Sequence, residues 1–167
     1  KRQLDSKIDL TIAGEQSSYL LMTQLLLGRF LFGLDDDPWK NDKEPAFLCA
    51  VPGFDRHFAT LEGLGLKMHT VNLCSSGIDL DDLNKKLSKY PNIKGLICVP
   101  RHSNPSGEVF SDENITNLLK ITKEYNSSFI NLFDHAYLIH DFDETRVQTP
   151  IPLLACLLYT SDAADDL

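Results

Sequence analysis

The feature that most constrains this chain is a regular alternation of short apolar runs with longer stretches of helical periodicity. Strands are predicted over residues 8–13, 46–51, 67–73, 94–99 and 128–133. Helices are predicted over residues 17–32 and 57–64, and in two further segments that follow Asp79 and Ser111. Strands that alternate with helices form βαβ units. The expected fold class is therefore α/β, a three-layer αβα sandwich around a mainly parallel sheet.

Two of the predicted helices carry a start signal and an apolar stripe. Asp79 and Ser111 are residue types that cap helix N-termini through their side-chain oxygens. The inner stripes are expected to be Leu80, Leu83 and Leu87 in the first helix, and Ile115, Leu118, Leu119 and Thr122 in the second.

Composition restricts the partners and the compartment. A chain of 167 residues fits one domain with a real core. Its net charge of −8 argues against duplex nucleic acid and membrane surfaces as partners. There is no signal-peptide pattern, and no apolar run approaches the roughly 18 residues that span a bilayer. The four cysteines show neither CxxC nor zinc-type spacing, and three lie in apolar or strand-like stretches typical of reduced core thiols. We expect a soluble, cytoplasmic protein.

The candidate functional residues follow the predicted strands, because ligands of parallel sheets bind beyond the strands' carboxyl ends. Four chemically different segments lie there: residues 14–18, 51–54, 100–107 and 134–137.

Each segment has a functional and an ordinary structural interpretation. The turn at Gly14 feeds a helix N-terminus that could hold a phosphate or be a simple cap. Phe54 could stack on a flat ligand or belong to the core. Asn104, next to a proline, could donate to a ligand or lie in a surface turn. Asp134 ends an apolar strand and needs a partner, since a buried unpaired charge is costly; a salt bridge or cap would also satisfy it.

In order and spacing, these segments resemble the large domain of a fold-type I, pyridoxal-phosphate-dependent aminotransferase of class I/II. The group that the chain most resembles is an aspartate aminotransferase group with PGYDRHF-like, CVP-x-x-SNP-x-G and D-x-AY blocks. Here the blocks read PGFDRHF (52–58), CVPRHSNPSG (98–107) and DHAY (134–137). The resemblance runs from about residue 8 to residue 142, and three blocks in order between matching strands make it specific.

The resemblance implies roles in binding pyridoxal 5'-phosphate. Asp134 would pair with the pyridine nitrogen and keep it protonated, which makes the ring an electron sink. Asn104 and Tyr137 would hydrogen-bond the phenolic oxygen of the ring. Phe54 would stack on the ring face.

The resemblance also implies a phosphate site, substrates and an assembly. The backbone of Glu15, Gln16 and Ser17 would bind the phosphate at the helix N-terminus. The enzyme would move an amino group from an amino acid, expected to be aspartate, to a 2-oxo acid, expected to be 2-oxoglutarate. It would act as a homodimer.

Three positions depart mildly from the pattern of the group. Phe54 stands where tyrosine is usual, which keeps stacking but removes a hydroxyl. Gln16 and His135 each stand where asparagine is common. Arg101 and His102 are interpreted as residues at the rim of the site and are left out of it.

The resemblance places the Schiff-base lysine well beyond the D-x-AY block, and no lysine follows Tyr137. The substrate-carboxylate arginine is not found either. We therefore expect residues 1–155 to be a partial large domain that is inactive alone. Residues 156–167 (CLLYTSDAADDL) break the βα pattern and resemble a translated sequencing adapter, so they are expected to be non-native.

Two other function classes stay open. The first is a non-catalytic domain of the same fold that senses an effector in a transcriptional regulator; an upstream helix-turn-helix would favour it. The second is a metal hydrolase that uses Asp134, His135, His140 and Asp141, although these residues lack a helical HExxH frame.

Overall fold

The computed structural model describes residues 17–33 and 36–137, so the strand expected at residues 8–13 lies outside the described residues. The described helices are α1 (Ser18–Phe32), the 3-10 helix η2 (Trp39–Asn41), α2 (Asp55–Gly63), α3 (Leu80–Lys89) and α4 (Asp112–Tyr125). The described strands are β1 (Ala46–Val51), β2 (Lys67–Cys74), β3 (Gly77–Ile78), β4 (Ile93–Cys98) and β5 (Ile130–Phe133).

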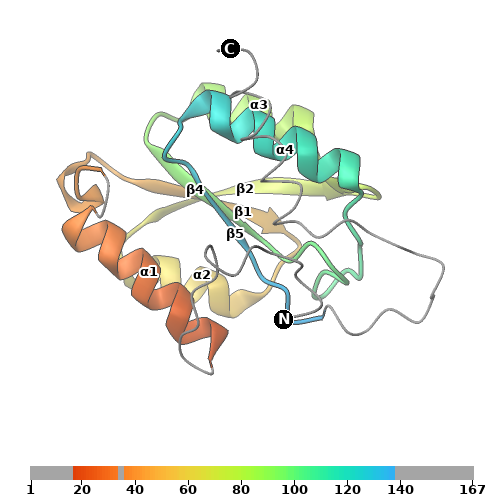
Figure 1. The fold of residues 1–167 in the computed structure, drawn as a ribbon, viewed down its shortest axis with the longest axis horizontal. Coiled ribbons are helices and arrows are strands. Elements are labelled where there is room, and N and C mark those ends of the chain that lie inside the picture. Colours follow the sequence, from red (N-terminus) through yellow and green to blue (C-terminus); the bar gives the residue numbers. More distant parts are fainter. Residues whose placement is uncertain (1–16, 34–35, 138–167) are drawn as a thin grey trace, which may run out of the picture.

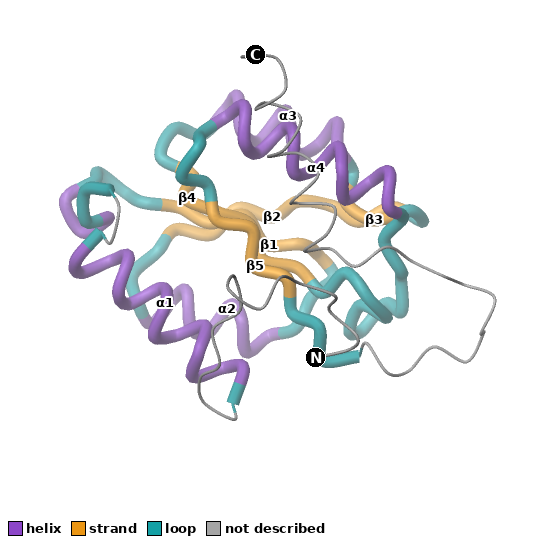
Figure 2. The backbone as a smooth tube through the Cα atoms, viewed as in Figure 1, coloured by secondary structure: helices purple, strands orange, loops and turns teal. Residues whose placement is uncertain are grey.

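One sheet, in the order β3-β2-β1-β4-β5, forms the middle layer. Strands β2, β1, β4 and β5 are parallel, and β3 pairs antiparallel with the end of β2. Helices α1 and α2 lie on one face of the sheet, and α3 and α4 lie on the other (Figures 1 and 2). This arrangement confirms the predicted α/β class and its mainly parallel sheet.

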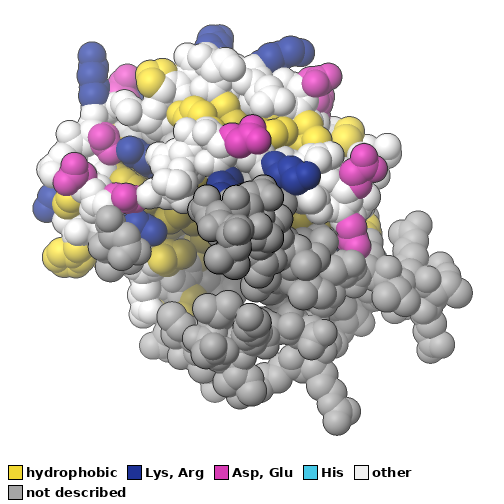
Figure 3. Space-filling model, turned by 45° about the horizontal axis from the view of Figure 1, so that its top comes forward, with side chains coloured by type: hydrophobic (Ala, Val, Ile, Leu, Met, Phe, Trp, Pro, Cys, Tyr) yellow, Lys and Arg dark blue, Asp and Glu magenta, His cyan; other side chains and the backbone are white. Residues whose placement is uncertain are grey.

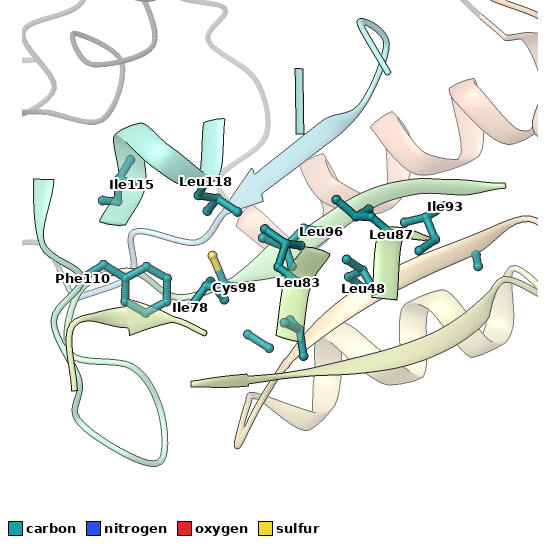
Figure 4. Packing of buried hydrophobic residues seen from close by; sticks show 13 residues of the cluster. Leu48, Ile78, Leu83, Leu87, Ile93, Leu96, Cys98, Phe110, Ile115 and Leu118 are labelled. Atoms are coloured by element: carbon teal, nitrogen blue, oxygen red, sulfur yellow. The ribbon is translucent and has the colours of Figure 1, made fainter. Parts of the chain in front are cut away.

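The central strands β1 and β4 are buried on both faces, which explains why they read as near-continuous apolar runs. In β1, Leu48 packs into the cluster beneath α3 and α4, and its neighbours Phe47 and Cys49 pack into the cluster beneath α1 and α2. Figure 4 shows the first cluster, in which side chains from the sheet meet those of α3 and α4.

The predicted helix starts are confirmed at both capped helices. Asp79 accepts hydrogen bonds at 3.0 Å from the backbone N–H groups of Asp81 and Asp82. Ser111 accepts one at 3.1 Å from Asn114. The sequence did not predict β3 or η2, because elements of two or three residues are too short to show a periodicity.

The described surface is mixed in charge, and two of the described thiols are buried. Lys and Arg side chains are interspersed with Asp and Glu over the described part of the face in Figure 3. No helix in the described ranges is long and apolar enough to cross a membrane.

Cys49 and Cys98 are buried and Cys74 is exposed. Burial raises the pKa of the Cys49 thiol to about 12.

Asn114 joins α4 to the short strand β3. Its Oδ1 accepts a 3.0 Å hydrogen bond from the backbone N–H of Ile78, and its Nδ2 donates a 2.8 Å bond to the Ile78 carbonyl. A side chain on Gly77, whose φ is +135°, would collide with this amide. One buried side chain therefore satisfies both backbone groups of a strand residue that has few other partners.

We expect Asn114→Ala to lower the free energy of unfolding by about 1–3 kcal/mol, because it leaves the buried backbone N–H of Ile78 without its partner and leaves the Ile78 carbonyl with only a weak bond from the Cys74 thiol. Asn117→Ala, half-buried on the same helix, is the matched control, since it gains the same helix propensity. Urea unfolding of both variants measures the difference. Equal losses for the two variants would contradict the anchoring role of Asn114.

Candidate functional site

A cavity of about 170 Å³ lies beside the carboxyl ends of β4 and β5. It is lined by Tyr19, Met22, Phe54, His57, Ile97, Leu132, Phe133, Asp134 and His135. Its walls are mostly apolar and aromatic, with two imidazoles and one carboxylate among them. This composition is typical of small-molecule and cofactor sites.

Asp134 is the charged centre of this cavity. Its backbone N–H donates to the Cys98 carbonyl at 3.0 Å, which holds the end of β5 against the end of β4. Its Oδ2 lies 3.0 Å from His57 Nε2, and its Oδ1 accepts a 3.0 Å hydrogen bond from the Ala136 N–H. Both carboxylate oxygens are thus engaged.

The pKa of Asp134 is lowered from its ordinary value. The hydrogen bond with His57 is the largest cause, and the charge of His57 and the Ala136 N–H act in the same direction. Burial acts against them, because it disfavours the charged form. The Asp134 side chain is 19% exposed. The site therefore holds an ionised carboxylate in largely apolar surroundings.

His57 is a site residue that sequence reasoning missed. It lies in the first turns of α2, which leaves the end of β1 after Phe54, and its side chain is only 8% exposed. The Phe54 ring meets the His57 ring edge-on, with centroids 5.2 Å apart. The available signal was the spacing: residues three apart share one helix face, and Phe54 was already a candidate.

Asn104 and Tyr137 come together from the loops that follow β4 and β5. Asn104 Nδ2 donates to the Tyr137 hydroxyl oxygen at 3.2 Å. The structure therefore brings these two candidates into contact, although they are 33 residues apart in the sequence.

Ser17 is the N-cap of α1, and its hydroxyl accepts a 3.4 Å hydrogen bond from the Leu20 N–H. The other two residues of the expected phosphate site, Glu15 and Gln16, lie outside the described residues. The phosphate site stays a prediction that rests on a helix N-terminus.

The interpretation of Arg101 as a rim residue was wrong, because only 7% of it is exposed. The loop after β4 folds back on itself: the Phe110 N–H donates to the Pro100 carbonyl at 2.9 Å, and the Ser103 N–H donates to the Glu108 backbone carbonyl at 2.9 Å. This closure buries Arg101 near His135. The positive charge of Arg101 helps to lower the pKa of His135. His102 is half-buried.

Within the described ranges, no group of three or more His, Cys, Asp or Glu side chains could hold a metal ion. Two members of the metal-hydrolase hypothesis, His140 and Asp141, lie outside those ranges. The hypothesis gains no support from Asp134, whose carboxylate is bound by His57 and Ala136.

Comparison with known proteins identifies related sequences and structures. The family model described as "Aspartate amino-transferase" matches residues 2–156. An aspartate aminotransferase of Corynebacterium glutamicum is 32% identical over 135 residues, which are 80% of this chain and 31% of that protein. The chain spans about a third of the length of the curated relatives that it matches.

Solved structures show the same fold. The crystal structure of an aspartate transaminase from Corynebacterium glutamicum matches with a TM-score of 0.83 at 28% identity, over 93% of this chain and 37% of that one. The α-aminoadipate aminotransferase LysN from Thermus thermophilus was solved with N-(5'-phosphopyridoxyl)-L-leucine. It matches with a TM-score of 0.64 at 23% identity, over 82% of this chain and 32% of that one, and supports the fold alone.

The Asp134 carboxylate should stabilise the fold in a pH-dependent way. Because its pKa in the folded protein lies below the ordinary value of 3.8, its charged form stabilises the fold above that pH. The stabilisation is lost as the pH falls through the folded-state pKa. We expect Asp134→Asn to lower the free energy of unfolding by about 1 kcal/mol at neutral pH. The difference should narrow below pH 3.8.

Urea unfolding at several pH values measures this difference. Asp55→Asn, an exposed carboxylate on the helix that carries His57, is the control and should stay within about 0.5 kcal/mol of wild type at each pH. A difference for Asp134→Asn that does not change with pH would show that the charge of this side chain does not stabilise the fold.

Proposed function

This chain belongs to the aspartate aminotransferase family, and we propose that it is part of the large domain of an enzyme that transfers an amino group from an amino acid to a 2-oxo acid. The observation that carries the proposal is the ionised Asp134 carboxylate, held by His57 in an otherwise mainly apolar cavity. The related proteins named above are aminotransferases, and they give no support to the alternative of an effector-sensing regulator domain.

The residues of the cavity fit pyridoxal phosphate, the cofactor that the family implies. A pyridine ring needs a flat apolar contact, which Phe54 offers, and an anion for its protonated nitrogen, which Asp134 offers. The Asn104–Tyr137 pair offers polar groups for a phenolic oxygen. When bound, the cofactor supplies an electron sink for the reaction at the substrate α-carbon.

Asp134 would hold a proton on the ring nitrogen. A carboxylate can do this only while it is ionised, and the hydrogen bond from His57 favours the ionised form. His57 and the Ala136 N–H also hold the two oxygens in one orientation. The negative charge is therefore in place before the reaction begins, so no reorganisation is needed when charge develops.

The other described residues would orient the ring and keep water away. Phe54 is itself held by the edge-on contact with His57, so the ring that stacks and the histidine that positions Asp134 support one another. Asn104 fixes the hydroxyl of Tyr137, and the two would hold the phenolic oxygen. Apolar walls exclude water and strengthen the interaction between Asp134 and the ring nitrogen.

We further propose aspartate as the amino donor and 2-oxoglutarate as the acceptor, which the names of the Corynebacterium relatives support.

We also propose that the enzyme is a homodimer. A homodimer would cover the apolar side chains that α1 exposes, of which Phe32 is 74% exposed. The buried free thiols of Cys49 and Cys98 are consistent with a reducing cytoplasm. The family match ends at residue 156, which supports the proposed boundary between residues 1–155 and 156–167.

In the full-length protein, Asp134→Asn should reduce kcat/KM far more than Asn104→Ala does. Asparagine is close to aspartate in size but neutral, so the ring nitrogen loses the charge that holds its proton, and a fall of about 10²–10³-fold is expected. Asn104→Ala removes one neutral hydrogen bond while Tyr137 remains, so a fall of at most roughly tenfold is expected. Steady-state kinetics with aspartate and 2-oxoglutarate at saturating cofactor measure both values.

Two controls separate the proposal from a general loss of structure. Asp55→Asn, an exposed neutralisation near the same cavity, should keep near-normal kcat/KM. The thermal midpoint of each variant should show that it is folded under the assay conditions. Near-normal activity of Asp134→Asn would mean that Asp134 does not bind the ring nitrogen, and the assignment of every other site residue would fail with it.

A further inference from the structure

A turn of three residues, Pro52, Gly53 and Phe54, joins the end of β1 to the start of α2. It carries two residues of the proposed site. Phe54 is the N-cap residue of α2, and the His57 N–H donates to the Phe54 carbonyl at 3.1 Å. A shift of this turn would therefore move both the Phe54 ring and the histidine that binds Asp134.

Gly53 is a point of close packing in this turn. A Cβ atom there would overlap the Ala50 carbonyl oxygen and would lie 2.8 Å from Phe58 Cζ. Gly53 is not one of the described glycines with a positive φ, so the backbone conformation does not explain why a glycine stands here. The close approach of the neighbouring atoms does explain it.

Neither neighbour of Gly53 gives way easily. Ala50 lies in β1, which is paired with β2 on one side and with β4 on the other, so the sheet holds its carbonyl in place. Phe58 is half-buried against the core cluster beneath α1 and α2. Between the turn and the loop after β4 lies a cavity of only about 10 Å³, which has room for about one water molecule. A side chain on residue 53 would therefore displace the turn itself.

We propose that Gly53 is a positioning residue of the cofactor site: because it has no side chain, the turn can close tightly, and this closure sets the positions of the Phe54 ring and of His57. Gly53 would act on pyridoxal phosphate only through those two residues, and through His57 on the Asp134 carboxylate, 3.0 Å away. The inference rests on the proposed function, because it assumes that pyridoxal phosphate binds beside Phe54 and Asp134.

In the full-length protein, Gly53→Ala should weaken the binding of pyridoxal phosphate by about three- to tenfold, which corresponds to one lost hydrogen bond. The value of kcat/KM should fall by up to about 10²-fold, the effect of a misplacement of about 1 Å. In the cofactor-free protein, the ¹H–¹⁵N signals of the His57 imidazole should shift, because the displaced turn moves His57 relative to Asp134. Absorbance and circular dichroism of the bound cofactor measure the binding, at a temperature at which the thermal midpoint shows that the variant is folded.

Gly63→Ala is the matched control. Gly63 is the last residue of α2, it is not one of the described glycines with a positive φ, and a Cβ atom there would have no neighbour within 4 Å. This variant adds the same methyl group eight to ten residues further along, where nothing is displaced. It should therefore leave the cofactor affinity, kcat/KM and the His57 signals unchanged, and equal effects of the two variants would overturn the inference.

Phe58→Leu tests the same contact from its other side and keeps Gly53. A site needs packing that holds its residues within about 0.5 Å, and the smaller side chain loosens the turn, so the affinity for pyridoxal phosphate should fall by about threefold. If Gly53→Ala does not fold, this second variant decides: a fall in affinity supports the inference, and wild-type affinity overturns it.

Unchanged affinity or unchanged His57 signals in folded Gly53→Ala, with wild type binding normally, would overturn this inference and leave the proposed function intact. A lower thermal midpoint with wild-type affinity would likewise overturn it, since the role of Gly53 would then be merely structural. If wild type itself does not bind pyridoxal phosphate, the proposed function fails, and this inference fails with it.

Discussion

The hydrogen bond between His57 and Asp134 is the interaction on which the site depends. It joins the first turns of α2 to the end of β5, across 77 residues of sequence, at 3.0 Å. A carboxylate at the end of a buried strand would otherwise carry an unpaired charge in apolar surroundings. With His57 as partner, the charge is kept, and its position is determined by two elements that the sheet itself holds in place.

The parallel sheet explains why all the candidate side chains meet at one edge. Helices lie on both faces of the sheet, and its central strands β1 and β4 are buried (Figure 1), so polar side chains of these two strands' segments can reach a ligand only where the strands end. The backbone N–H of Asp134 bonds to the carbonyl of Cys98, which brings the ends of β4 and β5 together. Asn104 and Tyr137, which follow those two strands, then come within hydrogen-bonding distance.

The sequence predicted those features that are encoded locally. The bounds of β1 were predicted correctly because six apolar residues end at a Pro-Gly pair, and α3 and α4 carried both a cap and a stripe. His57 was missed because its partner Asp134 is 77 residues away, and the one local signal, its three-residue spacing from Phe54, does not indicate that contact. Arg101 was placed at the rim because the residue type varies at such positions in the group that the chain resembles, whereas the loop folds back through backbone hydrogen bonds and Arg101 is buried.

Two polar side chains with buried atoms, Asn114 and His135, are partnered differently in this fold. Asn114 forms hydrogen bonds with both backbone groups of Ile78, so its polarity is fully used in holding β3. His135 also has a buried atom, Nδ1, but the described residues offer that atom no hydrogen bond. An apolar ring would leave no buried nitrogen unsatisfied at that place. The polar group that suits the cavity for a ligand with a protonated ring nitrogen is therefore the ionised Asp134 carboxylate, which His57 and the Ala136 N–H hold in place.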